Sequence, residues 1–314
     1  MATWGVSATI KAPAAQILHW AAFHLEVGAD CLHIYLDDDN RDAFNALKTH
    51  PKVSVTLCDE RYWERRKGTR PPTHQVRQTV NATHAYRNAH DLDWLIHIDV
   101  DEFLIADQLI GETLSTLPNG TFTARIRPME QLSGTPTAFK AFKAFIPNSP
   151  DRTPIVADLY PTYGAYLKGG FLSHLAGKVF ARTGHDKIHV RIHNVFQAGQ
   201  MVPTTELSPH IDLAHAHATS WESWLAAYGY RLTKGSYRAE LAPNKAYDKG
   251  GLSMHDLFTM IEAENGEAGL RAFFEEVCED SPDLRARLTK HGLLRQVNLA
   301  LNAPIDTYFP YKTL

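Results

Sequence analysis

Cysteine is scarce in this sequence, and it has no long apolar run. The chain has 314 residues and only three cysteines, Cys31, Cys58 and Cys278, which are widely spaced. An odd number at such spacings supports neither a disulfide framework nor a cysteine-based zinc site, so we expect buried thiols. No stretch of about 18 apolar residues occurs, and the first residues lack a basic segment followed by an apolar one. We therefore expect a cytoplasmic protein with neither a membrane span nor a secretory signal.

A large excess of charge of one sign is also lacking. The formal net charge is −3, with 21% charged and 44% hydrophobic residues, as in ordinary globular proteins. This composition predicts no nucleic-acid partner. Histidine, in contrast, is abundant: there are seventeen, and several lie between His185 and His217. That cluster is a candidate source of metal ligands.

The first third of the chain alternates short apolar runs with amphipathic stretches, which predicts an α/β fold with a mostly parallel sheet flanked by helices. The predicted strands are Val6–Ile10, Cys31–Leu36, Val53–Leu57 and Trp94–Asp99. Further short strands are predicted at Phe122–Arg127, Phe139–Phe145, Lys178–Arg182, Lys187–Ile192 and Ile211–Ala214. They would extend the sheet into a mixed one.

Beyond residue 219 the pattern changes to helices with polar faces. They are predicted at Ser220–Leu232, Met254–Ala263, Ala268–Cys278 and Leu284–Leu301. We therefore expect a catalytic domain over 1–219 and a helical extension over 220–314. The extension could complete an acceptor site, form a homodimer or dock peripherally on a membrane, and the sequence leaves these alternatives open. Its aromatic residues Trp221, Trp224 and Tyr228 could stack on a bound ligand, but their helical spacing favours core packing.

The most informative stretch is WLIHIDVDEFL at 94–104, an apolar strand that runs into three carboxylates. In a strand, Asp99 and Asp101 would point to the same face, roughly 7 Å apart. Two charges at that distance repel by roughly 2 kcal/mol at an effective dielectric constant near 20. A bound cation would relieve this repulsion, and Mg²⁺ or Mn²⁺ prefers carboxylate oxygens.

A helix predicted from His74 to about His90 has two stripes. Its apolar stripe, expected to face the sheet, is Val76, Thr79, Val80, Thr83 and Tyr86. Its polar stripe is Arg77, Asn81, His84 and Asn88. The polar stripe is either solvated or, since open α/β sheets bind ligands at the carboxyl edge, a ligand contact through Arg77 and Asn81. The preceding residues 60–73 are predicted to form a basic loop. This loop either binds a phosphate group or is a solvated insertion.

Three motifs carry a family resemblance. They are ILHW at 17–20 followed by His24, Leu25 and Gly28, HIYLDD at 33–38, and DWLIHIDVDEFL at 93–104. Over roughly residues 5–220 the chain resembles the bacterial family-two-like glycosyltransferases with the A-type, Rossmann-like fold. The chain departs from that family in carrying Lys11-Ala12-Pro13 after the first strand, where members usually have an acidic residue.

The resemblance implies a nucleotide-sugar donor and an Asp-x-Asp motif that holds Mn²⁺ or Mg²⁺. Asp101 would be the principal metal ligand, with Asp99 reaching the metal or the ribose. Asp37 and Asp38 would accept hydrogen bonds from ribose hydroxyls or uracil, unless they are merely solvated loop residues.

The resemblance also implies a histidine ligand. His215 matches its place, and His217 would share its face on a strand; a buried structural histidine is the alternative. An imidazole ligand would favour Mn²⁺. Lys178 and nearby backbone amides could contact the diphosphate or the acceptor.

The predicted function is a metal-dependent glycosyltransferase that moves a sugar from a nucleotide donor, expected to be UDP-linked, to a hydroxyl of a glycan or lipid-linked saccharide. Asp37, Arg77 and Asn81 would help to hold the donor. An inverting enzyme would need a carboxylate base, for which Asp158 is the candidate and Glu130 the alternative. Two other hypotheses stay open: a metal-dependent hydrolase that uses the same aspartates and histidines, and a non-catalytic nucleotide- or carbohydrate-binding protein.

Overall fold

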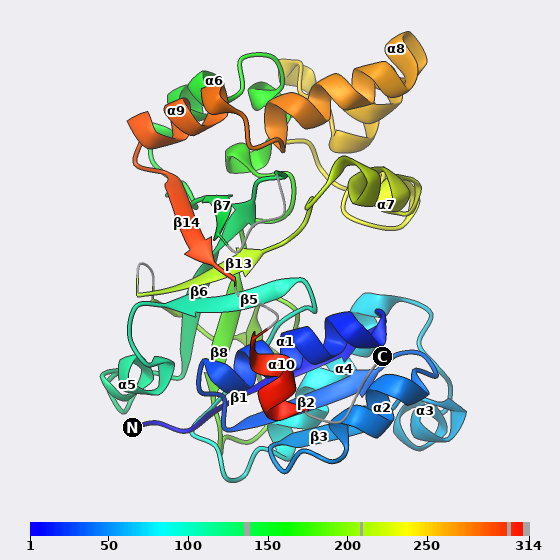
Figure 1. Cartoon of the computed structure of the whole chain (residues 1–314), viewed down its shortest axis with the longest axis vertical. Helices are drawn as coiled ribbons and strands as arrows, with labels where there is room; N and C mark the ends of the chain where they lie inside the picture. Colours follow the sequence, from blue (N-terminus) through cyan, green and yellow to red (C-terminus); the bar gives the residue numbers. More distant parts are fainter. Residues whose placement is uncertain (135–138, 208–209, 300–302, 310–314) are drawn as a thin grey trace. The chain divides into compact units, whose positions relative to one another are not determined.

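The computed structural model describes residues 1–134, 139–207, 210–299 and 303–309 (Figure 1). The chain folds into two compact units, each built from separate stretches of sequence. Unit 1 comprises Met1–Arg127, Ala176–Leu213 and Ala300–Leu314, and unit 2 comprises Pro128–Leu175 and Ala214–Leu299. This division differs from the one predicted at 219/220, because side chains of residues 128–175 share a hydrophobic core with the helices that follow residue 219.

Unit 1 is built around a mixed sheet with four adjacent parallel strands. These are β3 (Val53–Leu57), β2 (Cys31–Leu36), β1 (Trp4–Ile10) and β4 (Trp94–His97), in that spatial order. Next come β8 (Lys178–Arg182), antiparallel to β4, and β6 (Thr123–Gln131), antiparallel to β8. Every residue of β1 is buried, as expected for a strand covered on both faces.

Shorter strands complete unit 1. β12 (Thr205–Glu206) pairs with β6, and β5 (Glu102–Ala106) pairs with β13 (Ile211–His215), whose first residues belong to this unit. A separate antiparallel sheet consists of β9 (Ile188–Val190), β10 (Val195–Gln197) and β11 (Gln200–Met201). Of these shorter strands, β9 and β13 were predicted, whereas β5, β10, β11 and β12 were not. β5 was missed because it follows β4 after only a tight turn.

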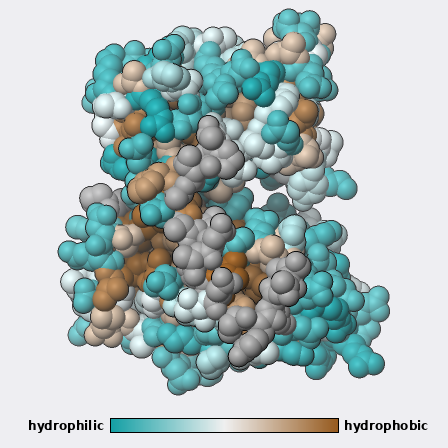
Figure 2. Space-filling view, in the orientation of Figure 1, coloured by the Kyte–Doolittle hydropathy of each residue, from teal (hydrophilic) through white to brown (hydrophobic). Residues whose placement is uncertain are grey.

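The helices of unit 1 are α1 (Ala14–Glu26), α2 (Arg41–Leu47), α3 (Glu60–Lys67), α4 (His74–Arg87), α5 (Ile110–Ser115) and α10 (Ala303–Tyr308). α10 packs along α1 although it lies near the other end of the chain (Figure 1). The prediction of a loop at 60–73 is wrong for its first half, because residues 60–67 form α3. Asp59 caps this helix by accepting a hydrogen bond from the Tyr62 amide at 2.8 Å. On the face shown in Figure 2, the region of α2 and α3 is largely hydrophilic.

α4 uses its faces differently from the prediction. Gln78 and Asn81 are 4% and 0% exposed, whereas Val76 is 46% exposed. The helix packs on β1. There the Asn81 amide donates a hydrogen bond to Thr9 Oγ1 at 3.0 Å. The polar stripe is therefore not solvated at Asn81, because polar groups of the sheet satisfy its side chain.

Unit 2 combines a small antiparallel sheet with helices. β7 (Phe139–Lys143) pairs with the end of β6 and with β14 (Leu294–Asn298). The helices are α6 (Arg152–Leu159), α7 (Trp221–Thr233), α8 (Met254–Val277) and α9 (Pro282–Lys290), with short 3-10 turns η1 (Gly164–Tyr166), η2 (Lys168–Gly170) and η3 (Tyr247–Lys249). Its core is rich in aromatic side chains: Trp224, Tyr237, Phe258, Phe273 and Phe274.

The last predicted helix, Leu284–Leu301, is only half correct. It ends at Lys290, and Gly292 then adopts a φ of +66° that an L side chain rarely tolerates. The following residues form β14 and complete the hydrogen-bonded ladder with β7.

The mixed α/β sheet with flanking helices and the helical C-terminal region confirm the predicted fold class. Every helix in the described part of the chain is too short or too polar to span a membrane.

Candidate functional site

The carboxyl ends of β1, β2 and β4 meet at one edge of the sheet in unit 1, because the three strands are parallel. Asp37 follows β2 directly, and Asp99 and Asp101 follow β4. The sequence placed its main site residues at this edge, and unit 1 brings them there.

Asp37 is a buried ion-pair centre. Its side chain is 1% exposed and lies 2.9 Å from Arg77 Nη2, 3.0 Å from Arg70 Nη2 and 3.4 Å from His74 Nδ1. Burial alone would raise the pKa of Asp37, but hydrogen bonds from His74 and Arg77 and the charges of Arg77 and Arg70 outweigh it and hold the pKa below its usual range. Asp37 is thus an ionised anchor that orients two guanidinium groups.

The neighbouring Asp38 is half-buried and has an unsatisfied atom. Its Oδ1 is buried without a hydrogen-bond partner among the residues that the structure describes. Because a buried acceptor without a partner is costly, this atom is suited to a ligand donor such as a hydroxyl or an N–H group.

Lys178 is a buried cation beside the acidic motif. Its ammonium is fully buried, 2.6 Å from Asp99 Oδ2 and 3.1 Å from Glu102 Oε2. Burial would lower the pKa of Lys178, but the charges of Asp99 and Glu102 raise it above its usual value. Gln78 donates a further hydrogen bond to Asp99. In this structure Lys178 is therefore a counter-ion of the acidic motif and not an exposed phosphate contact.

The acidic motif is a turn and not a strand. β4 ends at His97, and the Glu102 amide donates to the Asp99 carbonyl oxygen at 3.1 Å. The Glu102 carboxylate in turn accepts from the Asp99 amide at 2.7 Å. The prediction that Asp99 and Asp101 share one strand face is therefore wrong, because these bonds close the chain between β4 and β5.

The turn between β4 and β5 is rich in acidic side chains. The carboxylates of Asp99, Asp101 and Glu102 lie within four consecutive residues, and one ammonium contacts two of them. Asp101 is half-buried, and it is the residue to which the resemblance assigns the metal. Hard divalent cations bind such carboxylates, so the residues present fit a Mg²⁺ or Mn²⁺ ion.

Histidine side chains gather in unit 2. The ring centroids of His215 and His217 are 5.2 Å apart, and those of His174 and His215 are 5.4 Å apart. Tyr237 Oη lies 3.1 Å from His217 Nε2. Burial and the charge of Arg231 hold the pKa of His217 well below its usual value, so this ring is neutral. His217 is therefore engaged by Tyr237.

His174 was not singled out from the sequence, because no spacing rule links it to β13. Asp101 and His215 belong to different units, and their pairing on one ion stays a prediction.

Both candidate bases are engaged in ion pairs within unit 2. Asp158, at the end of α6, lies 2.9 Å from Lys290 Nζ and 2.6 Å from His291 Nε2. Glu130 is buried 2.9 Å from Lys143 Nζ, and it accepts hydrogen bonds from the backbone amides of residues 172 and 173. Burial would raise the pKa of Glu130, but the charge of Lys143 lowers it far below its usual value, so it is a poor proton acceptor.

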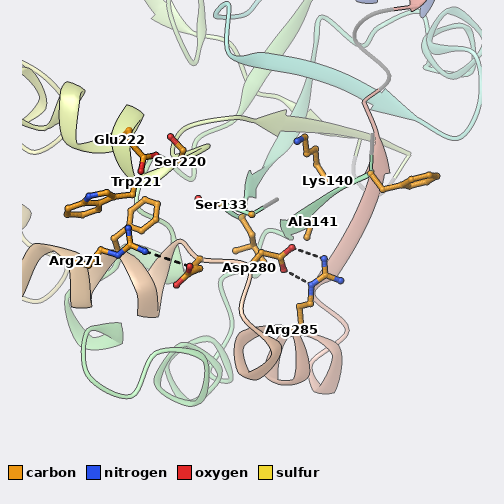
Figure 3. A pocket seen from close by; sticks show the side chains of 14 residues that line it. Ser133, Lys140, Ala141, Ser220, Trp221, Glu222, Arg271, Asp280 and Arg285 are labelled. Atoms are coloured by element: carbon orange, nitrogen blue, oxygen red, sulfur yellow. Dashed lines mark hydrogen bonds and ion pairs between the residues drawn. The ribbon is translucent and has the colours of Figure 1, made fainter. Parts of the chain in front are cut away.

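Unit 2 also contains a pocket of about 500 Å³ (Figure 3). At one end, the Arg271 guanidinium lies 5.2 Å from the centroid of the Trp221 indole and 2.8 Å from Glu275 Oε1. At the other end, Asp280 Oδ2 accepts a hydrogen bond from Arg285 Nη2 at 2.7 Å. The pocket thus combines paired charges with the Trp221 indole and the Ser133 and Ser220 hydroxyl groups, a lining that offers hydrogen-bond partners to a polar ligand.

No protein-family model matches the chain, and no curated protein matches it. Among solved structures, it is similar to HddC from Yersinia pseudotuberculosis, with 8% identity, a TM-score of 0.37, and coverage of 73% of this chain and 100% of that one. It is similar to 4-diphosphocytidyl-2C-methyl-D-erythritol synthase from Anaerococcus prevotii, with 8% identity, a TM-score of 0.34, and coverage of 73% and 96%. It is also similar to S. aureus TarS 1–349, with 10% identity, a TM-score of 0.37, and coverage of 98% and 81%. All three TM-scores are below 0.5, so these similarities add nothing to what the strand order itself shows.

Proposed function

We propose that the chain is a metal-dependent glycosyltransferase that moves a sugar from a UDP-linked donor to a hydroxyl acceptor. The observation that carries the proposal is the carboxyl edge of the sheet in unit 1. There the Asp99–Glu102 turn brings three carboxylates together, two of which contact Lys178, and Asp37 holds Arg70 and Arg77. Carboxylates for a metal ion and guanidinium groups for phosphate are the two requirements of a nucleoside-diphosphate site.

Within this proposal each residue has a separate task. Asp101 holds the divalent ion with help from Asp99, and the ion, when bound, neutralises charge on the departing diphosphate. Asp37 orients Arg77, and Asp38 Oδ1 accepts a hydrogen bond from the ribose or the base. Asn81 acts indirectly, because its amide is already bonded to Thr9 and Tyr62. The share of His215 in the metal site rests on the sequence resemblance alone.

The test is the thermal stability of the protein with UDP, GDP and CDP, each with Mn²⁺ and with EDTA. A ligand that binds only the folded state, present at a concentration of 100 times its Kd, raises the free energy of unfolding by about 2.7 kcal/mol. We expect a Mn²⁺-dependent increase with UDP that is lost in Asp101→Asn. The control variant Asp107→Asn changes an exposed aspartate of the same unit and should behave as wild type.

Other outcomes separate the alternatives. An increase with metal but with no nucleotide would favour the hydrolase. A nucleotide effect without sugar transfer from any nucleotide sugar would favour a binding protein.

The pocket in unit 2 supports a saccharide acceptor. Its half-buried Trp221 lines the pocket beside the hydroxyl group of Ser220. We expect Trp221→Ala to weaken binding of neutral disaccharides, as followed by tryptophan fluorescence. Tyr230→Ala is the matched control, since Tyr230 is 59% exposed on the same helix and does not line the pocket.

A further inference from the structure

A second cavity, of about 810 Å³, lies in unit 1 between the end of α3, the length of α4 and the segment after β9. It uses the face of α4 that carries Val76, Thr79 and Val80, whereas Gln78 and Asn81 are buried against the sheet. This cavity is therefore separate from the contacts made by Asp37 and Asn81. Its positively charged lining residues are Arg65, Arg66, Lys67, Arg87 and Arg191.

These five cations lack counter-charges. No aspartate or glutamate lines the cavity, and none of the five forms an ion pair with a carboxylate in the described ranges. Helix macrodipoles account for part of the pattern, because Arg65–Lys67 and Arg87 lie in the last turns of α3 and α4. Each helix end contributes only about half a negative charge, however, so five formal positive charges outweigh two helix ends.

Two of the guanidinium groups are held in place by neighbouring rings. Arg66 lies 5.0 Å from the Tyr62 ring centroid and donates a hydrogen bond to His84 Nε2. Since an arginine can only donate, His84 Nδ1 carries the proton and donates to Tyr35 Oη at 2.6 Å. Burial and the charge of Arg66 lower the pKa of His84 to about 4, so this ring stays neutral. Arg191 likewise lies 4.1 Å from the Phe196 ring centroid.

The rest of the lining is apolar. Val76, Val80 and Ile192 line the cavity between the cations, and the Val76 side chain is 46% exposed to water. A ligand that is only an anion would leave this apolar surface uncovered. A ligand with both an anionic group and an apolar portion would cover it and gain hydrophobic stabilisation.

We propose that this cavity binds a phosphate-bearing ligand with an apolar portion. The phosphate group pairs with Arg66, Arg87 and Arg191, and the apolar portion covers the valine and isoleucine side chains. A soluble phosphate compound and an anionic lipid headgroup share this chemistry. The proposal does not rest on the proposed glycosyltransferase activity, because it uses none of the residues assigned to that site.

The experiment compares two probes in EDTA, which leaves a metal-dependent donor site silent. Pyrophosphate binding is measured by calorimetry, and lipid binding by sedimentation with phosphatidic acid vesicles against pure phosphatidylcholine vesicles. We expect the wild-type protein to bind at least one anionic probe, and increasing salt to weaken that binding. The triple variant Arg66→Gln/Arg87→Gln/Arg191→Gln should bind roughly tenfold more weakly or worse.

The matched control is Arg41→Gln/Lys48→Gln/Lys52→Gln, which removes the same charge from exposed positions of unit 1 outside the cavity. It should bind as wild type does. Binding of vesicles alone identifies a lipid source, and binding of pyrophosphate identifies a soluble one; both support the proposal. Since Arg66 also supports His84, the double variant Arg87→Gln/Arg191→Gln keeps the test valid if the triple variant does not fold. The proposal is overturned if wild type binds neither probe, or if the double variant binds as tightly as the control.

Discussion

Among single residues, Lys178 is a buried cation whose ammonium contacts Asp99 and Glu102. In Lys178→Met, the buried carboxylate of Glu102 and the half-buried carboxylate of Asp99 lose this counter-charge, and breaking a buried pair costs about 3–5 kcal/mol. We expect the free energy of unfolding in urea at neutral pH to fall by about that amount. Lys52→Met, at an exposed position, should change it by less than about 0.5 kcal/mol. A stable Lys178→Met protein would show that the two carboxylates do not require this cation.

The buried ring of His24 should make the free energy of unfolding depend on pH. Its ring is fully buried in α1, Nδ1 donates to the Trp20 carbonyl oxygen at 2.8 Å, and Nε2 has no partner among the described residues. Burial lowers its pKa from 6.5 to about 4. Because the folded-state pKa is the lower one, the contribution of His24 is fully present above pH 6.5 and is lost as the pH falls towards 4.

This pH dependence can be isolated with His24→Phe, which places another aromatic ring beside Phe103. We expect wild type to lose about 2 kcal/mol more than the variant between about pH 7.5 and pH 5, as measured by urea unfolding. Equal losses in the two proteins would mean that His24 already titrates normally in the folded state.

At the scale of elements, α8 is interrupted at Gly266, which has φ 57° and ψ −145°. The sequence predicted a break here between two helices, and this glycine is its physical basis. Gly266→Ala forces an L side chain into a glycine-only region and should destabilise the protein by about 1–3 kcal/mol. The matched control is Gly229→Ala in α7, a helical position with open space around it, which should stabilise by about 0.5–1 kcal/mol. Thermal unfolding measures both; the same sign for both variants would contradict the strain at Gly266.

Comparison of the predicted and observed helices and strands shows which of them local sequence patterns can identify. The parallel strands of unit 1 were predicted, because buried strands flanked by turns have a local apolar signature. The buried face of α4 was predicted wrongly at Val76 and Asn81, because the helix packs on Thr9, a polar residue that accepts from an amide. β14 was predicted as helix, because only its pairing with β7 makes it a strand.

At the scale of the whole molecule, unit 2 is discontinuous in sequence. Its core joins Leu132, Val156 and Tyr160 to Trp224 and Phe273 from the C-terminal helices. A fragment of residues 220–314 would expose this core surface. We expect the isolated fragment to show no cooperative thermal transition by circular dichroism, whereas the full chain does. A cooperative transition of the fragment would support an independent helical domain from residue 220.

In the candidate site, some residues could be found from the sequence, whereas their contacts could not. The sequence identified Asp37, Asp99 and Asp101, because acidic residues directly after apolar strands have a local signature. It did not find that Lys178 pairs with Asp99, since the two residues are 79 positions apart. Nor did it indicate that Asp158 lies in contact with Lys290 and His291.

From the sequence alone we could predict the strands of the parallel sheet, the helical nature of the C-terminal region and the acidic residues at the carboxyl edge. These features follow from side-chain periodicity and turn chemistry, which act over a few residues. The tertiary structure decided which charges meet, which face of α4 is buried, and that the Asp99–Glu102 segment is a turn. Those outcomes depend on contacts between distant segments, and the free energy of burying a charge is set by the partner that folding brings to it.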